Sequence, residues 1–570
     1  MQRRFTHAPE SDIPAELSAH PPLLARLLHN RGVVSAEAAE RFLKPDYAAH
    51  MNDPFLMHDM EKAVERIAAA LDRKEKIVVY ADYDCDGIPG AVILHDFFTK
   101  VGHADFSVYI PDRHEEGYGL NAAAVEQFVA DGAKLIITID LGTSDHEHIA
   151  FAQNNGVDVI VTDHHLPHET LPEAFAVVNP KIGDTYPDPM LCGSGVVFKL
   201  VQAFLSKYGE RFGVEAGWEK WLLDMAGLAT LSDMVPLSGE NRVIASFGML
   251  VFRKSRRPGL GQLLRKLKIE QAHLTEDDVT FMVTPRINAA SRMDSPLRAF
   301  ELLSERDAAK AGALAEHLSG INDERKRLVA EIMKKAKHVL AEREIKDVIV
   351  IGNPQWRVGV LGLVASKIME EYDRPVFVWG REGSSGEAVV KGSCRSNGAV
   401  NVVRLMEAAK EHFHDYGGHE LAGGFSIAQD GVHFLEDRLN ALYEEVRGGG
   451  EAAAAHGHID ATLSLSEVSD ATATMLAKLS PFGLGNQKPL FRFPNLTVKS
   501  VRMFGKEKNH LELCVADERG IERTAMSFFA DAETFTKPVA PGTAVELIAH
   551  IDKSYFMGRP QIRLRIVDII

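Results

Sequence analysis

Cysteine is scarce in this chain, with 4 residues among 570. Cys85, Cys192, Cys394 and Cys514 lie far apart, so they define neither a zinc ribbon nor a redox pair. Such usage is typical of a reducing compartment. Long apolar runs are missing as well, since none reaches the roughly 20 residues that cross a bilayer. The N-terminal MQRRFTHAPE leads into no apolar signal-peptide core. We therefore expect a soluble, cytoplasmic protein with no membrane partner.

Positive charge is in deficit, with 64 Lys and Arg against 80 Asp and Glu and a net charge of −16. Proteins that bind nucleic acids are usually basic, so this balance argues against such a partner. The objection is weak, because bound cations offset metal-binding carboxylates and basic residues can gather in one groove. Net charge alone therefore does not exclude a nucleic-acid substrate.

Strands and helices alternate from residue 76 to residue 165, which predicts an α/β domain built on a parallel sheet with helices on both faces. Residues 300–345 are charge-rich with one apolar stripe, which indicates a long helix. A second α/β block follows it. After residue 485 apolar and polar residues alternate, which favours a small antiparallel barrel. At roughly 100–200 residues per domain, three or four domains are expected. We predict an N-terminal helical segment (1–70), a catalytic domain (71–255), a helical connector (256–345), a second α/β domain (346–447), a linker (448–458) and a C-terminal barrel (459–570).

Acidic residues and histidines follow the predicted strands of the first α/β domain. The carboxyl ends of parallel strands share one edge of the sheet, where ligands bind. Separate loops should therefore bring these side chains into one crevice. They are Asp82, Asp84 and Asp86 after the first strand, Asp140 after the third, Asp163, His164 and His165 after the fourth, and Asp233 after a later apolar stretch.

Crowded carboxylates repel one another unless cations lie among them. Oxygen ligands with an imidazole suit Mg²⁺ or Mn²⁺, and the histidine favours Mn²⁺. The D-x-D-x-D string ends in Gly87 and can present acids to two ions about 3.5–4 Å apart, which clamp the oxygens of a phosphoryl transfer. A single Asp after a strand is usually a helix cap. A calcium loop is a further alternative, but it needs Glu at position 12, where this chain has Ile93.

The segments YADYDCDG, TIDLGT, VTDHH and LATLSDMVPL resemble, in order and spacing, the four motifs of the DHH phosphoesterase superfamily. IPDRHEEGYGL, PRINAASRMDSP, WRVGVLGLVASKI, KGSCRSN, YGGHELAGGFSI and SPFGLGNQKPLF resemble RecJ-type single-strand-specific exonucleases within it, from about residue 70 to the end. The resemblance implies two Mn²⁺ or Mg²⁺ ions. It implies a first ion held by Asp82, Asp84 and Asp140, a second held by Asp86, Asp140, His164 and Asp233, and a catalytic group of Asp140, Asp163 and His165, with His165 facing the scissile phosphate.

The second α/β block resembles the DHH-associated domain, which implies phosphate binding by Ser393 and Arg395 with His419 near the cleft. Arg113 and Arg286 would add phosphate contacts, because the guanidinium fork matches phosphate oxygens. A solvated surface position is the alternative for each arginine taken alone. RecJ-like proteins usually have glycine where this chain has Ser291 and Cys394, and we expect Cys394 to lie in a loop that approaches phosphate.

The C-terminal region resembles an OB fold, in which cations beside aromatic side chains track a strand and stack its bases. Core aromatics under a solvated face are the alternative. The candidates are Arg502, Phe504, Lys506 and Lys508, and Lys553, Tyr555, Phe556 and Arg559.

The resemblance implies a 5′→3′ exonuclease on single-stranded DNA, acting in DNA repair and recombination. Its expected partners are single-stranded DNA and, beyond that, a single-strand-binding protein and a helicase, with the chain itself a monomer. One alternative is a small-substrate phosphodiesterase for oligoribonucleotides or cyclic dinucleotides, although those proteins generally lack the barrel. The other is an inactive replication scaffold, although such proteins lose motif acids that this chain keeps.

Overall fold

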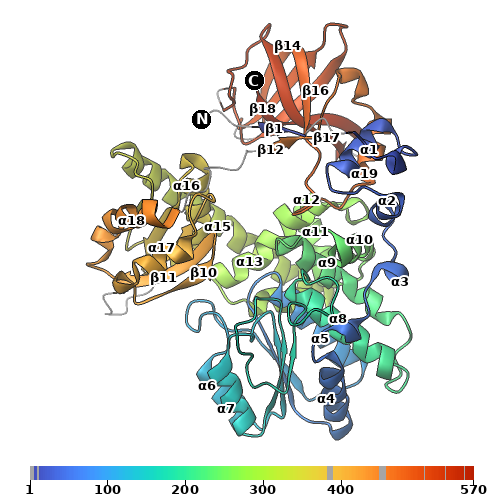
Figure 1. The fold of residues 1–570 in the computed structure, drawn as a ribbon, viewed down its shortest axis with the longest axis vertical. Helices are drawn as coiled ribbons and strands as arrows, with labels where there is room; N and C mark the ends of the chain where they lie inside the picture. The colour runs from blue at the N-terminus through green and yellow to red at the C-terminus, as the bar shows by residue number, and fades with distance from the viewer. Residues whose placement is uncertain are drawn as a thin grey trace. The chain divides into compact units, whose positions relative to one another are not determined.

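The computed structural model describes residues 5–8, 12–381, 389–447, 457–505, 508–532, 534–556 and 559–570. The chain divides into two compact units (Figure 1). One comprises residues 52–233 and 247–454, and the other comprises residues 1–51, 234–246 and 455–570. Among the described residues, no helix combines the length and apolar character needed to cross a membrane.

The catalytic domain is built on a five-stranded sheet with the order β3-β2-β4-β5-β6, in which every neighbouring pair is parallel. This confirms the predicted fold class. Helices α6 and α7 lie on one side of the sheet and α4, α5 and α8 on the other (Figure 1). The elements are α4 (Met60–Arg73), β2 (Ile77–Ala81), α5 (Gly87–Lys100), β3 (Phe106–Tyr109), α6 (Ala122–Ala130), β4 (Leu135–Ile139), α7 (His146–Asn154), β5 (Asp158–Thr162), β6 (Ala176–Val178) and α8 (Gly193–Tyr208).

The sheet is buried on both faces, which is why β2 reads as an apolar run and β4 as one interrupted only by Thr138. Val78 and Tyr80 alternate with the other residues of β2 and pack in the core beneath α6 and α7. On the opposite face α5 approaches β4 closely at Gly90, where a Cβ atom would lie 2.6 Å from the Ile139 side chain. The central strands are therefore held rigidly from both sides, which fixes the loops at their carboxyl ends.

The connector is helical, and its last helix, α15, is the long helix predicted for residues 300–345. Asp307 caps α15 by accepting the N–H groups of Ala309 and Lys310 at 2.9 and 2.8 Å. The helices are α9 (Leu223–Ser232), α10 (Gly239–Phe252), α11 (Pro258–Leu267), α12 (Glu276–Asp278), α13 (Thr284–Met293), α14 (Leu297–Ser304) and α15 (Ala308–Ala341). Because α13 packs on α15, residues of these two helices can form one surface.

The second α/β domain has a mixed sheet with the order β10-β11-β9-β8-β7, parallel between β7 and β8 and antiparallel elsewhere. Its elements are β7 (Ile349–Gly352), α16 (Leu361–Tyr372), β8 (Val376–Gly380), β9 (Val389–Arg395), α17 (Val402–Ala408), β10 (Asp415–His419), β11 (Ala422–Ala428) and α18 (Val432–Arg447). The predicted linker at 448–458 lies outside the described residues except for Gly457 and His458.

The other unit is a mostly antiparallel barrel with the order β13-β14-β15-β16-β18-β17, closed by pairing of β14 with β17. The predicted C-terminal barrel is therefore confirmed. Its elements are β12 (Gly457–Ile459), β13 (Ala461–Thr462), α19 (Asp470–Ala477), β14 (Phe491–Phe504), β15 (His510–Ala516), β16 (Glu522–Phe528), β17 (Ala544–Phe556) and β18 (Arg559–Ile569).

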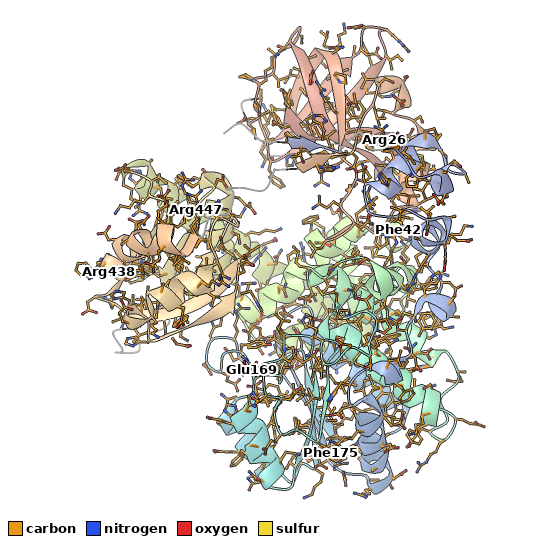
Figure 2. The ribbon with its side chains drawn as sticks, viewed as in Figure 1. Arg26, Phe42, Glu169, Phe175, Arg438 and Arg447 are labelled. Carbon is orange, nitrogen blue, oxygen red and sulfur yellow. The ribbon has the colours of Figure 1, made fainter. Side chains whose placement is uncertain are left out.

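The N-terminal residues belong to this barrel unit. Their elements are β1 (Phe5–His7), α1 (Pro22–His29), α2 (Ala36–Leu43) and α3 (Tyr47–His50), and β1 pairs with β12. Leu24 and Leu28 of α1 share a core with Phe491 and Phe493 of β14. The Arg242 guanidinium lies 3.7 Å from the ring centroid of Phe42, labelled in Figure 2. The expected segment 1–70 is thus divided, because residues 1–51 join the barrel unit and α4 joins the catalytic domain.

Candidate metal centre and phosphate pocket

Three loops at the carboxyl edge of the parallel sheet, together with the end of α9, bring the predicted acids and histidines together. Within each of three overlapping groups, one ligand atom per residue lies within 4.8 Å of the others. They are Asp82, Asp84 and Asp140; Asp86, His164 and Asp233; and Asp140, His164 and His165. The first group is the ligand set expected for the first ion, and the second group contains three of the four ligands expected for the second ion.

The loop after β2 is tight because its acids bond to their own backbone. Asp84 Oδ1 accepts the N–H groups of Asp86 at 2.7 Å and Gly87 at 3.3 Å. A Cβ atom at Gly87 would lie 2.3 Å from the carbonyl oxygen of Asp82, so only glycine fits there. The D-x-D-x-D-G string therefore folds into one compact turn that presents its carboxylates to the same crevice.

The N-terminus of α8 lies against the acidic residues and contacts Asp86 directly. Asp86 accepts the N–H groups of Gly193 at 2.6 Å and Ser194 at 2.7 Å. These donors sit at the positive end of the helix, where a carboxylate is favoured. A Cβ atom at Gly193 would lie 2.6 Å from the Cβ of Asp140, so glycine is required for this approach. The Cys192 side chain is a third hydrogen-bond partner of Asp86, and the carboxylate still keeps a lone pair for a metal ion.

Asp140 and His164 lie at the centre. Asp140 is buried and has a φ of +61°, and its Oδ1 lies 3.2 Å from His164 Nε2. The same nitrogen lies 3.8 Å from Asp86 Oδ2 and 3.7 Å from Asp233 Oδ2. The neutral imidazole that a metal ligand needs is favoured, because burial and the neighbouring His165 lower the pKa of His164 to about 3.

The electrostatics fit divalent cations. Burial and neighbouring carboxylates raise the pKa of Asp82 and Asp140 well above their usual range, of Asp86 to about 6 and of Asp233 to about 9. Buried oxygens of Asp82 and Asp233 have no hydrogen-bond partner. Deprotonated acids packed this closely need positive charge between them, and hard oxygen donors with one imidazole are what Mn²⁺ and Mg²⁺ accept. The donor set therefore fits the two expected ions.

Asp163 supports the histidines from behind. Its Oδ1 lies 2.7 Å from Nδ1 of His165 and accepts the N–H groups of His164 and His165, while Oδ2 accepts Thr143 N–H at 3.0 Å. Burial raises the pKa of Asp163, but these bonds and the charge of His165 outweigh it and lower the pKa below its usual range. The ionised carboxylate thus orients His165. Asp163 belongs to none of the three metal-binding groups.

Arg113 and Arg395 approach each other beside the metal centre, although they come from different domains. The Arg113 guanidinium lies 4.9 Å from the ring centroid of Tyr83. Burial and the charge of Arg113 together lower the pKa of Arg395, although Cys394 opposes this. Ser393 lies two residues before Arg395 on β9, and both side chains face Gly362 at the start of α16, where a Cβ atom would approach them. Cations that repel each other in this way favour an anion as a shared partner.

Arg292 is a third member of this cluster that sequence reasoning did not identify. Its Nη1 donates to the carbonyl of Gly359 at 3.2 Å. Burial and the charges of Arg113, Arg325 and Arg395 lower its pKa to about 9. Arg292 lies in the segment PRINAASRMDSP, which can be recognised from sequence. Its neighbours cannot, because they depend on how α13 packs in three dimensions.

Arg286 lies in a second cationic group with Arg325 and Lys326, which adjoins the first because the charge of Arg325 also acts on Arg292. Its Nη1 donates to the carbonyl of Met282 at 2.6 Å, and its Nε is buried without a partner. Burial and the charge of Arg286 lower the pKa of Arg325 and of Lys326 on α15. The structure therefore places Arg286 on a second basic surface along α13 and α15.

The second α/β domain also supplies His419, whose ring stacks on that of His165 with centroids 6.2 Å apart. The expectation for Cys394 is wrong. Cys394 is the next-to-last residue of β9 and does not lie in a loop, and its buried thiol packs in the domain core with Phe377 and Phe425. Side chains alternate along a strand, so Cys394 points away from Ser393 and Arg395. Ser291 is buried on α13, where its hydroxyl donates to the Asn288 carbonyl at 3.3 Å.

Two further groups missed from sequence support the site. Asn288 Oδ1 accepts the N–H of Cys85 at 2.9 Å and ties α13 to the metal-binding turn. Tyr118 donates its hydroxyl hydrogen to the carbonyl of Asp140 at 3.1 Å. Tyr118 stands in the quoted segment IPDRHEEGYGL, but its contact across the cleft follows from the fold.

On the barrel, several expected cations have acidic partners. Arg502 pairs with Glu512 at 2.7 Å and Lys553 with Asp470 at 3.4 Å. Phe504 lies beside His510 and Phe528. Lys508 is exposed and has a φ of +51°. Lys506 lies outside the described residues, as do the side chains of Tyr555, Phe556 and Arg559.

The fold and this crevice define a phosphoesterase of the DHH class. Residues 76–230 match the sequence model of the DHH family, N-terminal domain, residues 345–448 that of the DHHA1 domain, and residues 459–568 that of the RecJ OB domain. The chain belongs to the RecJ family.

Two relatives, each 32% identical to this chain, show its membership of the RecJ family. The single-stranded-DNA-specific exonuclease RecJ of Dickeya dadantii aligns over 99% of this chain and 98% of its own length. The single-stranded-DNA-specific exonuclease RecJ of Bacillus subtilis aligns over 96% of this chain and 68% of its own. The crystal structure of RecJ in complex with Mn²⁺ from Thermus thermophilus matches with a TM-score of 0.80 at 26% identity, covering 100% of this chain and 79% of that one. Its Mg²⁺ complex matches with a TM-score of 0.74 at 25% identity, covering 100% and 78%.

Proposed function

We infer that this chain is a single-stranded-DNA-specific exonuclease that uses two Mn²⁺ or Mg²⁺ ions and digests the strand from its 5′ end. The observation that carries this proposal is the position of an arginine cluster, formed by Arg113, Arg292 and Arg395, beside a crevice of metal-binding acids. A phosphodiester held at the acids would have a terminal phosphate within reach of the arginines. Its role would be in DNA repair and recombination.

Two ions would share the acids. Asp82, Asp84 and Asp140 would hold one, and the other would be held by Asp140 with Asp86, His164 and Asp233. Such a pair supplies a nucleophilic water at neutral pH and stabilises the charge that develops on the scissile phosphate. The shared ligand, Asp140, would fix the spacing between the ions.

His165 would act directly on the substrate. Its Nδ1 keeps a proton, because the ionised Asp163 accepts it at 2.7 Å. Burial lowers the pKa of His165, but the hydrogen bond and charge of Asp163 more than offset this and raise it. The protonated ring can then donate from Nε2 to an oxygen of the scissile phosphate, where negative charge grows in the transition state.

The terminal phosphate would bind Arg113, Arg292 and Arg395, with Ser393 beside them. A terminal monoester carries more negative charge than an internal diester, so charge-assisted hydrogen bonds favour an end over the interior of the strand. If the bound terminal phosphate is the 5′ phosphate, the enzyme digests the strand in the 5′→3′ direction. Arg286, with Arg325 and Lys326, would bind backbone phosphates further along the strand.

The barrel would bind the strand beyond these sites, as OB folds do. We propose a cytoplasmic monomer that works with a single-strand-binding protein and a helicase, since a strand-specific exonuclease needs duplexes opened and single strands presented. A small-substrate phosphodiesterase would have no use for this barrel. An inactive scaffold would have no reason to keep all the acids of the metal centre.

A direct test is degradation of end-labelled DNA and RNA. Single- and double-stranded substrates with 5′-phosphate, labelled at one end or the other, are incubated with Mn²⁺ or Mg²⁺. Early release of label from the 5′ end of single-stranded DNA, without internal cuts, is expected. Hydrolysis confined to di- and trinucleotides would replace the proposal with the small-substrate activity, and no hydrolysis with either ion would favour a scaffold.

A further inference from the structure

Tyr118 combines an exposed ring with a tethered hydroxyl. It lies in the loop between β3 and α6, and 56% of its surface is exposed. Its hydroxyl oxygen nevertheless lies 3.1 Å from the carbonyl oxygen of Asp140 and 3.3 Å from Nδ1 of His165. A ring with so little packing is oriented by its polar contacts, so these two contacts require an explanation.

The first contact falls on a strained backbone. Asp140 has a φ of +61°, a conformation that residues with a side chain rarely adopt. Its N–H donates to the Thr162 carbonyl at 2.9 Å, which ties the residue to β5. The Tyr118 hydroxyl secures the other side of the residue by donating to its carbonyl. Both bonds favour the left-handed conformation that directs the Asp140 carboxylate into the metal centre.

The second contact falls on the histidine that would face the phosphate. Nδ1 of His165 donates to Asp163 at 2.7 Å, so the longer approach of Tyr118 is a second branch from the same hydrogen. The single hydroxyl hydrogen of Tyr118 points to Asp140, and its oxygen is left to accept from His165. The two rings also meet edge to face, with centroids 5.9 Å apart.

We propose that Tyr118 is a positioning residue, whose hydroxyl links the backbone of the shared metal ligand Asp140 to the imidazole of His165. It sets the metal-binding carboxylate and the phosphate-facing ring in one geometry without itself binding metal. The proposal rests on the proposed function for the role of His165, whereas the link to Asp140 concerns metal affinity alone.

The test is Tyr118→Phe, which removes one oxygen and leaves the ring. Loss of one neutral hydrogen bond should weaken Mn²⁺ binding by about two- to tenfold in calorimetry on metal-free protein. With single-stranded DNA and saturating Mn²⁺, kcat should fall by a similar factor while KM stays within about twofold, because the hydroxyl bonds protein groups. Tyr416→Phe is the matched control, since it removes a tyrosine hydroxyl that bonds Glu407 in the second α/β domain.

The two readouts separate this inference from the proposed function. Unchanged Mn²⁺ affinity and unchanged kcat in Tyr118→Phe would overturn the positioning role, as would equal losses in the Tyr416→Phe control. A rise in KM with unchanged kcat would overturn it as well, because the hydroxyl would then be a substrate contact. If the unmutated protein degrades no DNA, the exonuclease proposal fails, and calorimetry on the same pair of variants still decides the link to Asp140.

Discussion

The ring of His419 stacks on the ring of His165, with planes 9° apart and centroids 6.2 Å apart. His165 follows a strand of the catalytic domain, and His419 ends a strand of the second α/β domain. The crevice is therefore built from both domains of one compact unit. This explains how residues more than two hundred positions apart, such as Arg113 and Arg395, come close enough for their charges to act on each other.

The metal centre predicts a strong effect of Asp140→Ala. This change removes the ligand shared by both proposed ions, so hydrolysis of single-stranded DNA should fall below detection. Metal-free protein should keep a native circular dichroism spectrum, because the substitution also relieves carboxylate repulsion. Calorimetry with Mn²⁺ should show weaker binding at both sites. Asp184→Ala, an exposed carboxylate outside the three groups, is the matched control. Near-normal turnover by a folded Asp140→Ala protein would refute the assignment of the two-ion site.

The arginine cluster predicts a preference for a phosphorylated end. The unmutated protein should digest 5′-phosphorylated strands faster than strands ending in 5′-hydroxyl. Arg395→Ala should shrink this preference by at least about tenfold, since one hydrogen bond to a charged group contributes roughly 1.5–3 kcal/mol. Mn²⁺ affinity should not change, because Arg395 belongs to none of the metal-binding groups.

Arg404→Ala serves as the control for Arg395, being an exposed arginine on α17 of the same domain. Equal rates on 5′-phosphate and 5′-hydroxyl ends in the unmutated protein would remove the terminal-phosphate pocket. Release of nucleotides from the 3′ end would reverse the proposed polarity.

The second basic surface predicts an effect on salt dependence. Arg325 on α15 lies near Arg286, and its Nε is buried without a partner. If the pair binds a backbone phosphate, Arg325→Ala should weaken binding to a long strand. It should also reduce the slope of log affinity against log salt by about 0.7, the value for one phosphate of a single strand. Arg327→Ala, an exposed arginine on the same helix, should leave the slope unchanged. If Arg325→Ala leaves the slope of log affinity against log salt unchanged, the strand does not bind at Arg286 and Arg325.

Much of the site could be predicted because its acids follow the strands of a parallel sheet. That rule assigns Asp82, Asp140 and His164 to one edge from sequence alone. It says nothing about Arg292 or Tyr118, whose neighbours are set by the packing of a helix and a loop across the cleft. The position of Cys394 was missed because the strand extends through the segment that had been expected to be a loop.

The N-terminal helices show a different limit of sequence reasoning. An apolar stripe indicates that α1 is buried on one face, but it does not identify the partner. Leu24 and Leu28 pack into a core formed with β14, more than four hundred residues later. The partner of such a helix is decided by long-range contacts. A consequence is that deletion of residues 459–570 would expose these leucines, so the barrel is better tested by single substitutions.

The barrel predicts that Phe529 contributes to binding of long strands. Phe529 is 80% exposed and has a φ of +56°, and it lies edge to face with His510, with ring centroids 4.9 Å apart. An exposed aromatic ring held in a strained backbone suits stacking of a base, which contributes about 1–3 kcal/mol. Phe529→Ser should therefore weaken binding of a long single strand by at least about fivefold. It should leave the hydrolysis rate of a trinucleotide unchanged, since so short a substrate spans only the metal centre. Phe434→Ser, which removes an exposed aromatic from α18, is the control. Equal affinity of the Phe529→Ser and unmutated proteins for a long strand would exclude this face of the barrel as a base-stacking surface.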